Sequence, residues 1–165
     1  MSLARTLKHL CMPHWLARRP FTKTVVDRIE AAVRKSEALH GAELHITLKT
    51  NLHPTALLRG LAPRARAIEV FSELRVWDTE HNSGVLLYLQ LVDRAIEIVA
   101  DRGINARVAQ HEWDGICRSM EAAFRRGEFE QGVLGAIEDV TTILARHFPP
   151  HPGKRDELPD KPVLL

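Results

Sequence analysis

A loop rich in acidic and amide side chains, between two apolar stretches, is the part of the sequence best suited to chemistry. Asp78, Glu80 and Asn82 place oxygen-bearing side chains at alternating positions, and Gly84 follows them. Alternation turns three such groups to one side when a loop curls around an ion. Calcium and magnesium prefer oxygen ligands of these kinds. The spacing therefore indicates a divalent-cation site, calcium or magnesium, ahead of the next strand.

A fourth oxygen donor is expected from the end of the following hairpin. Residues 84–91 are apolar on both faces, and residues 95–101 form a second run that ends in Asp101. Antiparallel pairing of the two runs returns Asp101 to the end where Gly84 begins. Asp78, Glu80, Asn82 and Asp101 then form the predicted metal site. The alternative is a solvated loop in which Asp78 or Asn82 caps a turn.

Basic side chains close to the same loop suit a phosphoryl group. Arg75, His81 and Arg102 are the candidate phosphate-binding residues. The sequence holds no P-loop, no paired-aspartate motif and no Cys-x5-Arg signature at Cys117. A catalytic residue is therefore unknown, and any phosphate hydrolysis is expected to need a metal ion to activate water.

The elements that must position these residues follow from hydrophobic periodicity. Apolar residues at helical spacing predict helices over 22–39, 63–76, 110–127 and 128–148, and alternation predicts a strand over 42–50 before the hairpin. Trp77 and Trp113 are expected to be core anchors. Gly132 and Gly135 in the last helix predict close packing against a neighbour. Helices before, between and after the strands predict helices on both faces of a small mixed sheet.

The chain divides into a basic N-terminal segment, residues 1–20, a domain over residues 21–148, and an extended tail rich in proline and charge, residues 149–165. Residues 3–10 could form a short amphipathic helix, and the tail ends in an apolar patch that could dock on a partner or on its own domain. The 165 residues suit one domain with a substantial core.

Charge and cysteine content limit the partners and the compartment. A net charge of +2 without a basic stripe argues against nucleic acid as a partner. No apolar run approaches the roughly 18 residues that cross a bilayer, so no membrane span is expected. Cys11 and Cys117 are expected to be reduced thiols, which places the protein in the cytoplasm.

Residues 75–104 and 120–149 together resemble the TPM domain, the family found in thylakoid-lumen, photosystem-repair and nematode channel-modulator proteins. The residues that carry the resemblance are the Asn82-x-Gly84 loop before the apolar strand and the later Phe124-x-x-Gly127-x-Phe129-x-x-Gly132 element. The similarity covers about residues 22–148. It implies a three-layer α/β/α sandwich with a small mixed sheet of about four strands flanked by helices.

The resemblance also implies a range of functions. Family members include acid phosphatases, proteins that bind calcium or other divalent cations near this loop, and scaffold or repair factors. Bacterial relatives are often exported and anchored in membranes, whereas this chain resembles a short cytosolic bacterial variant. We expect a divalent-cation-binding interaction or repair-type module, with another TPM-domain protein as one potential partner. The alternative is a metal-dependent, acid-phosphatase-like hydrolase of phosphate monoesters.

Overall fold

A four-stranded mixed sheet organises the protein. The computed structural model describes residues 7, 9, 11–153 and 157–165. In these residues the strands are β1 (Glu43–Lys49), β2 (Gly84–Gln90), β3 (Ala95–Ala100) and β4 (Val163–Leu164), and their order in the sheet is β3-β2-β1-β4. β2 and β3 are antiparallel, which confirms the predicted hairpin, whereas β1 is parallel to both β2 and β4.

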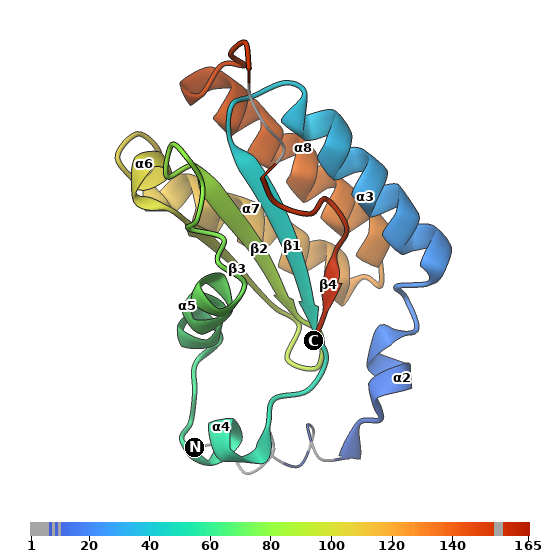
Figure 1. Cartoon of the computed structure of the whole chain (residues 1–165). Helices are drawn as coiled ribbons and strands as arrows, with labels where there is room; N and C mark the ends of the chain where they lie inside the picture. The colour runs from blue at the N-terminus through green and yellow to red at the C-terminus, as the bar shows by residue number, and fades with distance from the viewer. Residues whose placement is uncertain (1–6, 8, 10, 154–156) are drawn as a thin grey trace.

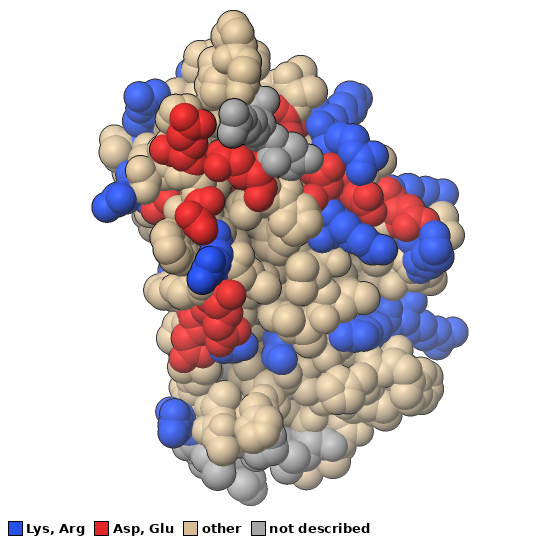
Figure 2. Space-filling view, viewed as in Figure 1, with Lys and Arg blue, Asp and Glu red and all other residues tan. Residues whose placement is uncertain are grey.

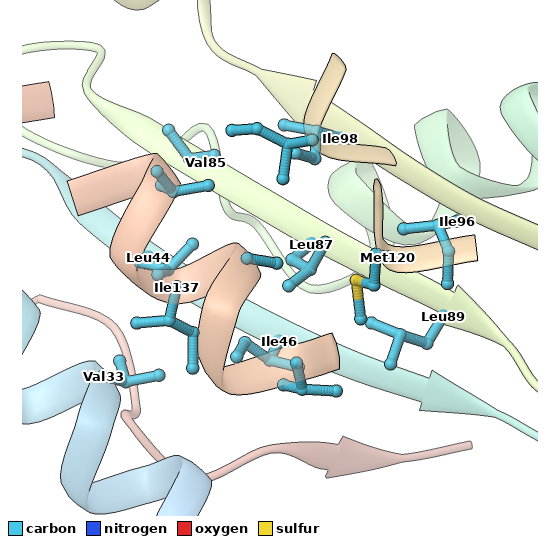
Figure 3. Packing of buried hydrophobic residues seen from close by; sticks show 14 of the residues in the cluster. Val33, Leu44, Ile46, Val85, Leu87, Leu89, Ile96, Ile98, Met120 and Ile137 are labelled. Carbon is cyan, nitrogen blue, oxygen red and sulfur yellow. The ribbon is translucent and has the colours of Figure 1, made fainter. Parts of the chain in front are cut away.

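Three long helices cover one face of the sheet (Figure 1): α3 (Lys23–Glu37), α7 (Gln110–Arg125) and α8 (Phe129–His147). Their apolar faces meet alternate residues of the strands in the larger core. Figure 3 shows Val33 of α3, Met120 of α7 and Ile137 of α8 directed toward the strand residues Ile46 and Leu87. Burial of this apolar surface is the main force that holds the helices on the sheet.

The opposite face is covered by a thinner layer. α5 (Pro63–Glu73) and the C-terminal tail lie there, and Leu158 of the tail joins Phe71, Leu86, Tyr88 and Val99 in a second, smaller core. β2 is buried along its whole length because it contributes to both cores. The α/β/α sandwich is thereby confirmed, and the apolar character of both faces of β2 is explained by its central place.

Three short helices complete the described part of the chain: α2 (His14–Arg18), α4 (Pro54–Leu58) and α6 (Arg102–Asn105). The sequence pattern did not predict α2 or α6, because helices of four or five residues carry too little periodicity. The helix expected over residues 3–10 lies mostly outside the described residues. Among the described residues, no helix is long and apolar enough to span a membrane.

Two expectations about packing were wrong in part. Trp113 is buried as predicted, but Trp77 is 48% exposed, because it follows α5 where the chain turns toward the surface. Gly132 packs closely, since an added Cβ would lie 3.1 Å from the Cβ of Ala123. Gly135 does not, because nothing lies within 4 Å of an added Cβ.

The described tail is extended, and it ends in β4, a strand that its proline content did not suggest.

Candidate functional site

The candidate site lies at the edge of the sheet where β1 and β2 begin and β3 ends. Glu43 of β1 pairs with Gly84 of β2, and the backbone N–H of Asp101 donates to the carbonyl of Gly84 at 2.8 Å. The N–H of Glu43 donates to the carbonyl of Ser83 at 3.1 Å. The loop 78–83 is therefore fixed directly beside the end of β3. α6 lies at the same end of the sheet (Figure 1).

Close backbone approaches explain the glycines of this edge. A Cβ on Gly84 would lie 1.8 Å from the carbonyl oxygen of Val76, and one on Gly103 would lie 2.6 Å from that of Asn82. Asn82 has a positive φ of 52°, a conformation that asparagine adopts more readily than most residues. The Asn-x-Gly pattern is therefore a packing requirement of the loop.

Asp101 is the most distinctive of the four predicted metal ligands. It is only 9% exposed. Its Oδ1 accepts a hydrogen bond from the N–H of Arg102 at 2.7 Å and caps α6. Its Oδ2 is buried and has no hydrogen-bond partner among the described residues. A buried carboxylate oxygen without a donor or a cation is costly, so this atom fits a role as a metal ligand.

The other three predicted ligands are arranged differently. Oδ1 of Asn82 accepts a hydrogen bond at 3.0 Å from Nε of Arg102, the residue that follows Asp101. Asp78 is exposed and lies 4.0 Å from Nη1 of Arg75. Glu80 is exposed, and its N–H donates to the Glu157 carboxylate at 3.1 Å. In this arrangement the described residues contain no cluster of three histidine, cysteine, aspartate or glutamate side chains that could hold a metal ion. Of the predicted donor set, Asp101 and Asn82 each contact Arg102, through its backbone N–H and its Nε respectively, whereas Asp78 and Glu80 contact other residues.

A pocket of about 530 Å³ opens beside the loop. Its lining includes Glu80, His81, Ser83, Arg107 and His151. The rings of His81 and His151 meet edge to face, with centroids 5.3 Å apart. Two imidazoles and a guanidinium give this pocket donors for an anionic group.

Arg107 is held at the pocket by contacts with the end of α8. Its Nη1 donates to the carbonyl of His147 at 2.9 Å, and its guanidinium carbon lies 4.9 Å from the centroid of the Phe148 ring. Sequence reasoning missed Arg107 and His151, because each comes from a segment without a motif and only the fold brings them to the loop. Of the three predicted phosphate-binding residues, His81 lines the pocket. Arg102 contacts Asn82, and Arg75 contacts Asp78.

Buried Glu43 attaches the C-terminal tail to the same edge. Its Oε2 accepts hydrogen bonds from the N–H groups of Glu157 at 3.2 Å and Leu158 at 3.3 Å. The polar residues that alternate along β1 could face either the solvent or another part of the chain. The structure shows an interface, because the tail covers Glu43, His45 and Thr47.

A thiol nucleophile at Cys117 is disfavoured by its surroundings. Burial, with a smaller contribution from the nearby Glu97 carboxylate, raises the pKa of the Cys117 thiol to about 12. The thiolate is the nucleophilic form, so this residue is almost entirely unreactive near neutral pH.

Comparison with known proteins agrees with the geometry. A family model described as the TPM domain matches residues 19–143. The NMR structure of the BA42 protein from the psychrophilic bacterium Bizionia argentinensis superposes with a TM-score of 0.77 and 28% identity, covering 87% of this chain and 94% of that one. The NMR structure of the N-terminal domain of a P. gingivalis protein gives a TM-score of 0.61 at 18% identity, over 79% of this chain and 82% of that one, and supports the fold alone. No curated protein matches.

Proposed function

Because the chain belongs to the TPM domain family, we propose that it is a divalent-cation-binding interaction module whose ion site lies around Asp101. The observation that carries this proposal is the buried Oδ2 of Asp101, which has no hydrogen-bond partner among the described residues. A bound cation would compensate the cost of burying that charge. Calcium or magnesium is the ion class that suits carboxylate and amide oxygens.

The remaining ligands come from the neighbouring loop. Asp78 and Glu80 are exposed carboxylates on the loop that ends beside Asp101, and Asn82 contributes its amide oxygen once Arg102 turns away. Binding therefore couples the ion to the conformation of residues 78–83. A loop that orders around an ion can present a defined surface to a protein partner, for which another TPM-domain protein in the cytoplasm is our candidate.

A second candidate function is metal-assisted hydrolysis of phosphate monoesters. It is favoured by the pocket beside the loop, where His81, His151 and Arg107 supply donors for a phosphoryl group. Hydrolysis would use a metal-activated water as the nucleophile. The arrangement assigns no catalytic residue, and for this reason we rank cation-dependent binding first.

The test is thermal melting of the chelator-treated full chain, with calcium, magnesium, manganese and zinc titrated in separately. An ion that binds only the folded state raises the melting temperature in proportion to ln(1 + [ion]/Kd). We expect calcium or magnesium to raise it in the wild type but not in Asp101→Asn or Asp78→Asn. Asp139→Asn, which removes an exposed carboxylate on α8, is the matched control and should respond like the wild type.

Two results separate the candidates. An ion-dependent rise in melting temperature, without hydrolysis of a chromogenic phosphate monoester, supports the binding module alone. Ion-dependent hydrolysis that is lost in His81→Gln and Arg107→Gln supports the phosphatase. If no ion stabilises the wild type, the site around Asp101 is a polar turn and both proposals fail.

A further inference from the structure

The N-terminal segment is attached to the domain through polar groups. His9 is buried, and its Nδ1 accepts from the N–H of Leu52 at 3.1 Å while its Nε2 lies 2.9 Å from Oδ1 of Asp93. Nδ2 of Asn51 donates to the carbonyls of His9 at 2.8 Å and Met12 at 3.0 Å. These contacts fix the described part of the segment against the chain that follows β1.

The apolar side chains of the same segment face the solvent. Leu7 is 60% exposed, Trp15 is 69% exposed and Leu16 is 42% exposed. α2, which carries Trp15 and Leu16, has no buried residue. An ordinary surface helix buries its apolar side chains and exposes its polar ones. In α2 the small Ala17 packs against the larger core, whereas the large side chains of Trp15 and Leu16 are exposed and available to something outside the domain.

The stretches of sequence that form this end of the molecule are basic, and ion pairs neutralise three of their cations: Lys23 pairs with Asp27, Arg64 with Glu97, and Arg66 with Glu69 and Glu73. Residues 1–26 contain Arg5, Lys8, Arg18, Arg19 and Lys23 but no aspartate or glutamate, and residues 44–68 contain Lys49, Arg59, Arg64 and Arg66, again without an acidic residue. The net charge of the whole chain is only +2, because acidic residues in the rest of the sequence balance the basic residues of these two stretches. On the face that Figure 2 shows, no acidic side chain of the described residues is visible at the lower end, where α4 lies in Figure 1.

We propose that this end of the molecule, the described part of residues 7–19 together with α4, binds the surface of a bilayer of anionic phospholipid. We call it the N-terminal surface. Tryptophan favours the interface between headgroups and acyl chains. Basic side chains nearby are attracted to anionic headgroups, and the two weak contributions add.

Shape favours a bilayer over a protein partner. α2 lies at the periphery of the domain (Figure 1), and its most exposed apolar side chain is Trp15. A projecting apolar side chain inserts into a fluid interface without a complementary pocket, whereas a protein partner must supply one. Two acidic side chains close to this surface already have basic partners: Asp93 faces His9, and Glu69, which lines the pocket beside α4, pairs with Arg66.

Such binding orients the candidate ion site away from the membrane. The N-terminal surface follows the end of β1, whereas the loop 78–83 lies beside the start of β1. The seven residues of β1 separate the two by about 20 Å. A protein bound through Trp15 would therefore present Asp101 and the adjacent pocket to soluble partners. This inference does not depend on the ion site.

The experiment is sedimentation of the full chain with vesicles. Vesicles of phosphatidylcholine with about 40 mol% phosphatidylglycerol should bind the protein, and vesicles of phosphatidylcholine alone should bind it much less. About 0.5 M sodium chloride should release it, because salt screens the headgroup attraction. In a Trp77→Phe background, where Trp15 and the buried Trp113 remain, binding should shift the tryptophan emission to shorter wavelength.

Variants identify the surface responsible. The double variant Trp15→Ser, Leu16→Ser should weaken partitioning into anionic vesicles at least about tenfold. The double variant Arg19→Ser, Arg59→Ser should weaken it by a similar factor, since each basic side chain near an anionic membrane contributes about fivefold to the partition coefficient. Trp77→Ser is the matched control, because Trp77 is a second exposed tryptophan outside the N-terminal surface, and it should partition like the wild type. All of these side chains are exposed, so circular dichroism and melting should be unchanged. Absence of binding to anionic vesicles, or equal loss with Trp77→Ser, overturns the proposal and leaves a protein as the partner of this surface.

Discussion

The backbone N–H of Asp101 lies 2.8 Å from the carbonyl oxygen of Gly84, so the last residue of the hairpin returns to the residue at which it began. This single hydrogen bond joins the end of β3 to the loop that precedes β2. It sets the buried carboxylate of Asp101 at the start of α6, the helix whose Arg102 donates a hydrogen bond to Asn82. Asp101 therefore has two roles. One carboxylate oxygen caps α6, and the other is buried without a hydrogen-bond donor among the described residues.

Two substitutions at Asp101 should separate these roles. Asp101→Ala removes the cap of α6 and should lower the free energy of unfolding by about 1 kcal/mol in the absence of ions. Asp101→Asn keeps a capping oxygen and removes the buried charge, so its stability without ions should lie within about 0.5 kcal/mol of the wild type, or above it. Urea unfolding in chelator measures both. Equal losses in the two variants would mean that the charge itself stabilises the apoprotein and would contradict this account.

The glycines of the fold should respond in opposite directions to alanine. Gly84→Ala places a Cβ 1.8 Å from the carbonyl oxygen of Val76, and a backbone atom in a buried edge cannot move away at little cost. We expect a loss of more than about 3 kcal/mol of unfolding free energy. Gly135→Ala fills open space in the middle of α8 and should raise stability by about 0.5 to 1 kcal/mol. A neutral Gly84→Ala variant, measured by thermal melting, would show that the edge of the sheet is looser than the structure describes.

The central hairpin was predictable because its signal is local. Residues 84–91 are apolar at consecutive positions, which identifies a strand buried on both faces, and a short turn then fixes where Asp101 must lie. The proximity of Asp101 to the loop therefore followed from pairing geometry alone. The long helices could also be predicted from the sequence, since their apolar residues recur at helical spacing over many turns.

The rest of the site depended on contacts that no local pattern encodes. β4 has only two residues and follows a segment rich in proline, so its pairing with β1 leaves no periodic signal. Arg107 and His151 reach the pocket from segments 44 residues apart, after α6 and after α8 respectively. The hydrogen bond from Arg102 to Asn82 could not be foreseen either, because the sequence gives side-chain types but not which acceptor each cation meets.

The tail should contribute to stability through one buried side chain. Leu158 packs into the core between the sheet and α5, whereas Leu164 in β4 is exposed. Leu158→Ala should therefore cost about 2 to 3 kcal/mol. Leu164→Ala changes the same residue type in the same segment and should cost less than about 0.5 kcal/mol. Urea unfolding of the pair compares them directly. Similar small costs in both would indicate that the tail is not packed on the domain in solution.

The contact between β1 and the tail should weaken in acid because of His45. The side chain is buried beneath the tail, its Nδ1 lies 3.2 Å from the carbonyl of Pro159, and its Nε2 is buried without a hydrogen-bond partner among the described residues. Burial lowers the pKa of His45 below its ordinary value of 6.5, because the charged ring is poorly solvated there, and the hydrogen bond to Pro159 only partly opposes this.

The direction of the pH effect follows from proton linkage. Below pH 6.5 the unfolded chain, or a state with the tail released, binds a proton at this ring that the folded state does not bind. The stability that neutral His45 contributes is thus fully present above pH 6.5 and is lost as the pH falls toward the lowered folded pKa. The unfolding free energy of wild type should therefore fall more steeply between about pH 6.5 and pH 5 than that of His45→Gln.

Urea unfolding and limited proteolysis of the tail across this pH range measure the effect. His111→Gln is the matched control, since His111 is exposed at the start of α7, and it should keep the steep dependence of the wild type. If His45→Gln and His111→Gln behave alike, His45 does not titrate between the folded and unfolded states in this range. The expected result is that only His45→Gln reduces the dependence of the unfolding free energy on pH, and that the wild-type tail is cleaved faster at pH 5. Protonation of the buried His45 ring would then be coupled to release of β4, the strand at the edge of the sheet.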